Sequence, residues 1–183
     1  MKRVLGGSRL IFVGLLVLTV SGCASRSEAP AAPASTSTRS IDRPLDARGL
    51  LACSAFPREQ LVAANIDAAT ASDQSNAIAT ECDWKTADGA TALSFLINVN
   101  NSLDLILGSG HARKNLQEYR IHGYPAVREG SPGDSACAVY VEVAPSQVFL
   151  VDVTTRAPES SVRPCEIAER GASAVIDSLS SRS

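Results

Sequence analysis

An apolar run near the start of the chain marks a segment that we expect to be removed from the part of the chain that can fold. Basic residues precede the run, which extends over 11 residues from Leu10 to Val20. This length is typical of a secretory signal peptide, whereas a membrane-spanning helix needs about 20 apolar residues. The small residues Ser21 and Gly22 follow, at the place where a signal peptidase cleaves. The sequence therefore predicts a signal peptide over residues 1–22 and an extracytoplasmic mature chain.

The four residues Val20–Cys23, Val-Ser-Gly-Cys, resemble the lipobox of bacterial lipoproteins. In such signals the cysteine thiol receives a diacylglyceryl group, cleavage follows, and the new amino terminus is often acylated as well. The resemblance implies that Cys23 is lipidated and that the protein is anchored at the extracytoplasmic face of the cell membrane. Each buried methylene contributes about 0.8 kcal/mol, so two or three acyl chains form a sufficient anchor. The alternative is an ordinary secretory signal followed by an unmodified cysteine.

A segment rich in Ala, Pro, Ser and Thr follows the cysteine. It has no aromatic and almost no large apolar side chain, so it cannot bury enough surface to become ordered. We expect residues 23–48 to be the lipidated N-terminus and a disordered tether, with an end-to-end distance of roughly 25–30 Å. Its composition also permits O-glycosylation, although an unmodified spacer is the simpler interpretation.

Loss of the signal peptide makes the chain more acidic. The complete chain has 17 basic and 19 acidic residues, and Lys2, Arg3 and Arg9 are removed, so the mature balance is 14 − 19 = −5. A negative balance does not suit nucleic acid or direct adhesion to an anionic membrane. We therefore expect no nucleic-acid partner, and contact with the membrane only through the lipid on Cys23.

Four cysteines remain for the folded part once Cys23 is set aside: Cys53, Cys82, Cys137 and Cys165. An even number of cysteines outside the cytoplasm predicts two disulfides, for which three connectivities are possible. We favour Cys53–Cys82 and Cys137–Cys165, with sequence separations of 29 and 28. A metal site is the alternative, but the chain has no C-x-x-C pair and only His111 and His122 as imidazoles. The sequence predicts no metal and no cofactor.

The remaining residues, 49–183, form one domain of ordinary size. Alternating apolar residues predict about five strands, and Asp88-Gly89 indicates a turn between the first two. We expect helical segments near Pro57–Ile66, from Ser102, and from Cys165 to the end. The pattern of Asp67–Asn76 predicts a polar loop. Because short turns join most strands, we expect an α+β two-layer domain, with a largely antiparallel sheet and the helices on one face.

Short motifs in a fixed order support a family resemblance. They are a cysteine before the first helix (Cys53), Glu81–Trp84, His122–Ala126, Cys137–Val139, and Pro164-Cys165 before the closing helix. Together they resemble a family of actinobacterial lipoproteins with four cysteines and a single domain of unknown function. The resemblance extends over about residues 51–179, and the 14 arginines against three lysines suit a GC-rich genome. It implies a location and a fold, and it implies no catalytic residues.

No pattern in the sequence predicts a catalytic site. Gly108–His111 lacks both the Gly-x-Ser-x-Gly pattern of a serine hydrolase and the third glycine of a dinucleotide loop. Glu81 and Asp83 share one face of a strand, where solvent exposure explains them. His122 precedes a glycine within an expected strand and is interpreted as a surface or hydrogen-bonded side chain.

The second face of the expected sheet is more apolar than a solvated face should be. It would carry four sizeable side chains, which we predict as a candidate partner surface: Leu96, Tyr140, Val148 and Leu150. Scattered surface hydrophobes, or a covering loop, are the alternative explanation. The overall prediction is a non-catalytic binding or accessory module of the cell envelope, with an envelope protein or a glycolipid as partner. An envelope-acting enzyme with an unrecognised site is the alternative.

Overall fold

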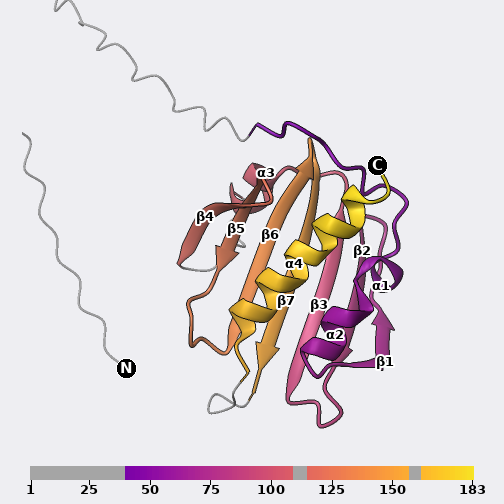
Figure 1. Ribbon diagram of the computed structural model, residues 1–183, viewed down its shortest axis with the longest axis vertical. Coiled ribbons are helices and arrows are strands. Elements are labelled where there is room, and N and C mark those ends of the chain that lie inside the picture. Colours follow the sequence, from indigo (N-terminus) through magenta and orange to yellow (C-terminus); the bar gives the residue numbers. More distant parts are fainter. Residues whose placement is uncertain (1–39, 109–114, 157–161) are drawn as a thin grey trace, which may run out of the picture. The chain divides into compact units, whose positions relative to one another are not determined.

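A seven-stranded antiparallel sheet forms the centre of the computed structural model, which describes residues 40–108, 115–156 and 162–183 (Figure 1). The strand order is β1-β2-β3-β7-β6-β5-β4. Along the chain the elements are α1 (Ala52–Ala55), α2 (Arg58–Ala63), β1 (Asp67–Asp73), β2 (Ala79–Lys85), β3 (Thr91–Asn98), α3 (Leu103–Gly108), β4 (Leu116–Ile121), β5 (Tyr124–Glu129), β6 (Ala136–Ala144), β7 (Gln147–Thr155) and α4 (Pro164–Ser180). None of the described helices is long and apolar enough to cross a membrane. The expected signal peptide, Cys23, the tether as far as residue 39, and His111 lie outside the described residues.

The main hydrophobic core lies between the sheet and the layer formed by α1, α2 and α4, in which α4 crosses β6 and β7 (Figure 1). Apolar residues alternate along β3, β6 and β7, so every second side chain enters this core. Phe56 lies between Trp84 and Phe95, with ring centroids 5.5 and 5.2 Å apart. Gly171 lets α4 approach this cluster, since a Cβ atom there would lie 3.0 Å from the Phe56 ring. The expected mixed α and β architecture with an antiparallel sheet is confirmed.

The sheet has seven strands where the sequence predicts about five, and one extra strand comes from a tight hairpin. The expected single strand over Glu118–Val127 is two strands, β4 and β5, joined by the two residues His122 and Gly123. Their φ angles of 49° and 90° are those of a type I′ turn, which matches the twist of the flanking strands. His-Gly is not the usual Asn-Gly or Asp-Gly signal, and for this reason the turn escapes a sequence-based reading.

The other extra strand is β1, which lies in the segment expected to be a polar loop. Its side chains are small or polar and largely exposed, so no apolar alternation marks it. The strand exists because β2 offers it a pairing edge, and the Lys85 amide also donates a hydrogen bond to Thr70 Oγ1 (2.8 Å). Its register shifts between Asp67 and Ser72, as at a β-bulge.

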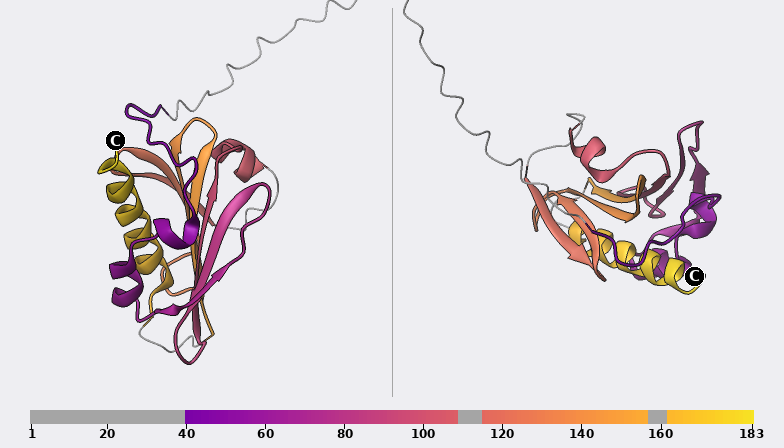
Figure 2. Two further views of the ribbon diagram at one scale, coloured as in Figure 1. Left: turned by 90° about the vertical axis from the view of Figure 1, so that its right-hand side faces the viewer. Right: turned by 90° about the horizontal axis from the view of Figure 1, so that it is seen from above.

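The helices do not all lie on one face of the sheet, which corrects that part of the prediction. Helix α3 packs on the face opposite α4, as Figure 2 shows in the view from above. Leu103 of α3 is fully buried there in a second, smaller core with Val127 and Val148. Because this short helix covers part of the second face, that face has more apolar side chains than a face exposed to solvent would have.

The folded domain begins before residue 49, so the predicted end of the tether at Arg48 is too late. Leu45 and Ala47 are 4% and 2% exposed and belong to the core. The segment is also held by hydrogen bonds from the Leu45 amide to the Val143 carbonyl (2.9 Å) and from the Ala47 amide to Gln147 Oε1 (2.7 Å). Two isolated apolar residues in a polar segment are enough to fill gaps in a core that the rest of the chain has formed.

Two disulfides join the helix layer to the sheet, with the pairing favoured from the sequence. Cys53 of α1 is bonded to Cys82 of β2, and Cys137 of β6 is bonded to Cys165 in the first turn of α4. The cysteines of the strands are 0% and 1% exposed. Each bond therefore attaches one helix to a strand from inside the core.

Candidate functional site

The predicted partner surface is partly buried by the fold. Leu96, Leu150 and Tyr140 lie opposite one another in one row across β3, β7 and β6, on the face away from α4. These three side chains are half-buried, whereas Val148 is 2% exposed and packs against Leu103 of α3. Val148 is therefore a core residue and not part of a surface, because α3 occupies the space in front of it.

Acidic residues lie beside the remaining row. Glu81 of β2 is opposite Leu96, and its Oε1 accepts a hydrogen bond from Ser94 Oγ (3.0 Å). On the other side, the Tyr140 hydroxyl donates to Oε2 of the buried Glu129 at 3.4 Å. The predicted pair Glu81 and Asp83 thus lies on this face as expected, at intermediate exposure, with Glu81 bonded to its neighbour in the sheet. The remaining row is therefore half-buried and has an acidic side chain at each end.

A cavity of about 410 Å³ lies where α4 begins, at the other end of the molecule's helical layer from the C-terminus. Its walls come from the β5–β6 connection, the end of β7 and the first turns of α4. Cys165, bonded to Cys137, forms part of the lining, so one wall is covalently fixed to the sheet. Volumes of about 300–1,000 Å³ are typical of small-molecule sites. No local sequence pattern indicates this cavity, because its walls come from segments that are distant in sequence.

Charged side chains of both signs line the cavity. Arg128 of β5 donates from Nη1 to Glu169 Oε1 at 2.8 Å, and its Nη2 donates to Gln117. Its side chain is 19% exposed, and its buried Nε has no hydrogen-bond partner among the described residues. Arg163 forms a second, exposed pair with Glu166 at 3.0 Å. The cavity is therefore lined by a partly buried guanidinium next to carboxylates.

Tyr119 of β4 stands close to this ion pair on the same face of the sheet. Burial raises the pKa of its hydroxyl, the negative charge of Glu169 raises it further, and Arg128 acts in the opposite direction. The hydroxyl oxygen is buried and has no hydrogen-bond partner among the residues that the structure describes. Tyr119 is therefore a neutral phenol at physiological pH, not a base.

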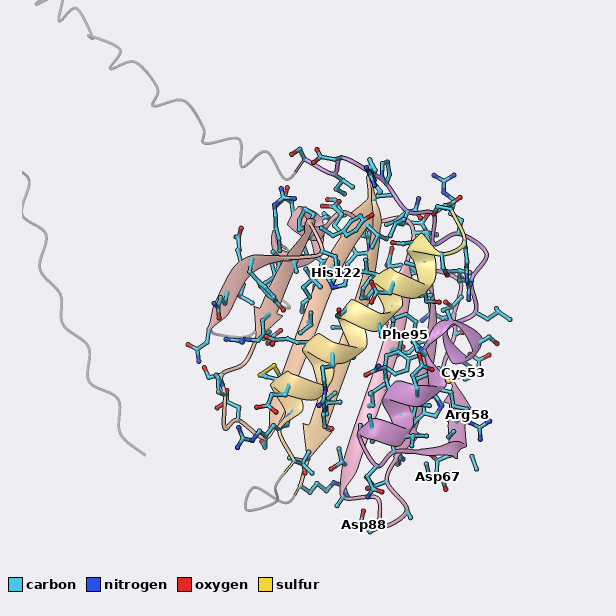
Figure 3. All side chains as sticks on the ribbon, viewed as in Figure 1. Cys53, Arg58, Asp67, Asp88, Phe95 and His122 are labelled. Atoms are coloured by element: carbon cyan, nitrogen blue, oxygen red, sulfur yellow. A yellow bond between two sulfur atoms is a disulfide. The ribbon has the colours of Figure 1, made fainter. Side chains whose placement is uncertain are left out.

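A serine, a histidine and an aspartate are linked by hydrogen bonds between the β4–β5 turn and α4. His122 Nε2 is 2.8 Å from Ser173 Oγ, and His122 Nδ1 is 2.9 Å from Asp177 Oδ1. The β4–β5 turn carries His122 to α4 (Figure 3). Residues 173 and 177 lie one turn apart on the same face of this helix. These are the contacts of a nucleophile, a general base and an orienting carboxylate.

The surroundings of this trio differ from those of a serine hydrolase site. The side chains of His122 and Asp177 are 46% and 66% exposed. Backbone amides around Ser173 are used within α4, so they cannot form an oxyanion hole. The trio connects the β4–β5 hairpin to α4, and its hydrogen-bond chain can also polarise the Ser173 hydroxyl. Sequence reasoning missed it because a serine and an aspartate four residues apart on a helix are common.

Other sequence candidates have structural roles or lie outside the described residues. Asn98 Oδ1 accepts hydrogen bonds from the amides of Asn100 and Asn101, at 2.9 and 3.0 Å. Ser102 Oγ accepts from the Leu105 amide at 3.3 Å, as expected for the N-cap of α3. Of the Gly108–His111 motif, only Gly108 is described. No group of three His, Cys, Asp or Glu side chains that could hold a metal ion occurs within residues 40–108, 115–156 and 162–183.

Comparison with known protein families assigns the chain to a family. The family model "Protein of unknown function (DUF3558)" matches residues 18–178, which is most of the 183-residue chain. The chain belongs to this family. The DUF3558 match begins inside the apolar run that precedes Cys23, and it includes both disulfides, the cavity and the His122 trio. No curated protein and no solved structure matches the chain.

Proposed function

We propose that this DUF3558 protein is a lipoprotein, anchored through Cys23, whose disulfide-bonded domain is a non-catalytic binding or accessory module of the cell envelope. The proposal includes an actinobacterial origin, for which the arginine-rich composition is the support. The cavity at the start of α4 is the proposed binding site, and it is the observation on which the binding role depends.

The sequence and the disulfides support the proposed location. The lipobox-like Val20–Cys23 follows an apolar run of signal-peptide length, and the two disulfides suit an oxidising compartment. With Cys23 as the first residue, residues 24–39 connect the lipid to the domain.

The cavity supports a binding role because its walls are fixed before any ligand arrives. The Cys137–Cys165 bond and the Arg128–Glu169 pair hold the first turns of α4 against the sheet. A preorganised site loses less conformational entropy on binding. The guanidinium groups of Arg128 and the more exposed Arg163 line the cavity and favour a ligand with a hydrogen-bond acceptor, such as a carboxylate, a phosphate or a sugar oxygen.

Membrane attachment tests the location. Mass spectrometry of the mature N-terminal peptide should show acyl groups on Cys23. A Cys23→Ala variant should leave the membrane fraction or keep its signal peptide. If this variant still remains with the membranes after high-salt and carbonate washes, the lipid anchor is not on Cys23.

Site-specific photocrosslinking in the native membrane tests the binding site. A benzophenone amino acid at Ser135, an exposed serine of the cavity, should give one dominant adduct. The matched control carries the same probe at Ser75, an exposed serine in the β1–β2 connection. Equal adducts at both positions, or none at Ser135, would show that the cavity does not bind a partner or ligand.

The His122 trio supports a second candidate function, an acyl-transfer hydrolase that acts on envelope material. Ser173 Oγ would attack an ester carbonyl, and His122 Nε2, 2.8 Å away, would accept the hydroxyl proton and pass it to the alcohol that leaves as the ester C–O bond breaks. Water would then hydrolyse the acyl-serine and restore the Ser173 hydroxyl. A fluorophosphonate probe tests this function directly. Labelling that is lost in Ser173→Ala and His122→Ala, and kept in Ser178→Ala on the same helix, would support the hydrolase. Failure of the probe to label Ser173 would exclude it.

A further inference from the structure

The sheet has two edge strands, and they differ in regularity. At one edge, β1 has a register shift between Asp67 and Ser72, and such a bulge interferes with the addition of another strand. At the other edge, β4 pairs with β5 in an unbroken register from Leu116↔Glu129 to Ile121↔Tyr124. Strand β4 contains no proline and is mostly exposed. It is therefore the edge that can accept a further strand.

The hairpin turn determines which backbone groups of β4 point outward. Ile121 and Tyr124 flank a two-residue turn, so they form a hydrogen-bonded pair, and hydrogen-bonded pairs alternate along the hairpin. The backbone N–H and C=O groups of Ile121, Tyr119 and Gln117 thus point toward β5 and form hydrogen bonds with it. The groups of the residues between them, Glu118 and Arg120, point to the outer edge.

We propose that β4 pairs with β4 of a second copy of this chain, antiparallel, with Tyr119 opposite Tyr119 across a twofold axis. In this register Glu118 of each copy lies opposite Arg120 of the other, and both outward-facing residues can exchange their backbone hydrogen bonds. The twofold axis generates the pair of Glu118 and Arg120 twice, so each copy contributes one acidic and one basic side chain. The two sheets would join into one continuous antiparallel sheet.

Neighbouring registers are less favourable because of the same two charges. Shifting the second copy by two residues in either direction keeps the outward-pointing backbone groups opposite each other. Such a shift places either Glu118 opposite Glu118 or Arg120 opposite Arg120. Like charges directly opposite each other destabilise a strand pair, whereas opposite charges stabilise it. The order Glu118-Tyr119-Arg120 therefore favours one register, and the partner that it favours is β4 of a second copy.

The side chains on β4 are compatible with this pairing. Glu118 and Arg120 are exposed, and Tyr119 is half-buried on the face that carries α4. Arg120 donates to the carbonyls of Ser40 (3.2 Å) and Gly123 through Nη1 and Nη2. A guanidinium has five N–H donors, so it can bind a carboxylate of the second copy as well.

Disulfide crosslinking of the full-length protein in membranes tests the register. Residues opposite each other in a non-hydrogen-bonded pair have Cα atoms about 4.5 Å apart, within the range of a disulfide. A Tyr119→Cys variant should thus form, on mild oxidation, a covalent dimer that a reductant splits. Gln117→Cys, two residues along the same strand, is the matched control and should form no covalent dimer, and neither should the unmodified protein.

Charge exchange gives a second test that does not depend on the fold of the cysteine variant. Sedimentation of the detergent-solubilised protein should show a dimer weakened about tenfold in Glu118→Arg and in Arg120→Glu, because each change creates two like-charge pairs. The double exchange should restore it, whereas Glu59→Arg on α2 should have no effect. A monomeric unmodified protein, equal crosslinking at residues 117 and 119, or a Tyr119→Cys adduct with another chain would overturn the proposal.

Discussion

The Leu45 amide donates a hydrogen bond to the carbonyl of Val143 at the end of β6, 2.9 Å away, although the two residues are distant in sequence. This contact places a polar, linker-like segment inside the folded domain. Leu45 is 4% exposed and packs in the main core. The segment before α1 is therefore part of the hydrophobic core and not only a connection to the membrane.

We expect Leu45→Ala to destabilise the domain by about 2–5 kcal/mol, the usual cost of removing a buried leucine side chain. Urea denaturation of residues 38–183 measures this cost. Leu51→Ala is the control, since that leucine is 63% exposed and should change the stability by less than about 0.5 kcal/mol. Equal effects of the two changes would mean that residues 40–48 do not pack in solution.

Helix α3 offers a matched pair of leucines that tests whether it covers the second face of the sheet. Leu103 is fully buried against Val127 and Val148, and Leu105 of the same helix is 58% exposed. Leu103→Ala should lower the free energy of unfolding by about 2–5 kcal/mol, and Leu105→Ala by much less. If neither change matters, α3 is not docked and the second face is open.

The two disulfides should contribute similar stability, because they close loops of nearly equal length. Their sequence separations are 29 and 28, which correspond to roughly 3–4 kcal/mol each in the chain-entropy model. Alanine replacement of both cysteines of one bond, compared by urea denaturation with the same change at the other bond, measures the two contributions. Peptide mapping without reduction should recover Cys53 with Cys82 and Cys137 with Cys165, and crossed links would contradict the structure.

Asp88 in the β2–β3 turn should stabilise the domain at neutral pH, and this contribution should be lost in acid. Hydrogen bonds from Thr86 Oγ1 (2.5 Å) and the Ala90 amide (2.9 Å) hold the pKa of this carboxyl below its ordinary value. Its contribution is present above the unfolded-state pKa of about 4, and is lost as the pH falls through the lower folded-state value. Asp88→Asn should therefore flatten the decrease in melting temperature between about pH 5 and pH 2. An unchanged pH profile would contradict this role.

Tyr119 should affect the stability of the domain at alkaline pH. Its raised pKa means that folding favours the protonated phenol, so its contribution is complete below the unfolded-state pKa of about 10 and declines above it. Tyr119→Phe should remove this alkaline loss. Because the hydroxyl is buried without a described partner, the change should cost nothing at neutral pH. A clear loss of stability at pH 7 would show that the hydroxyl has a partner.

Much of the fold is predictable from local patterns. Alternating apolar residues identify β3, β6 and β7, and Asp88-Gly89 marks the turn at which Gly89 has a φ of 67°. These predictions succeed because strand periodicity and turn conformation depend on residues that are neighbours in the chain. The cysteine pairing follows the same logic, since similar spacing and the expected faces of the strands favour it.

The elements that were missed depend on partners rather than on their own sequence. Strand β1 has no apolar pattern and forms because β2 offers it an edge. The His122-Gly123 turn has the conformation of Asn-Gly without that signal, and it brings His122 to Ser173 and Asp177. No local pattern could indicate this trio, because a hairpin turn and a helix meet only in the folded chain.

By itself, the sequence determined the disulfide-bonded α+β domain, with an antiparallel sheet and a helix at its end. Apolar periodicity and cysteine spacing are properties of the chain before it folds. Only the tertiary structure decided that α3 would cover Val148, that Leu45 would join the core, and that Arg128 and Glu169 would line a cavity. Each of these depends on how closely surfaces from distant segments fit, because burial is a property of the packed molecule and not of any one segment.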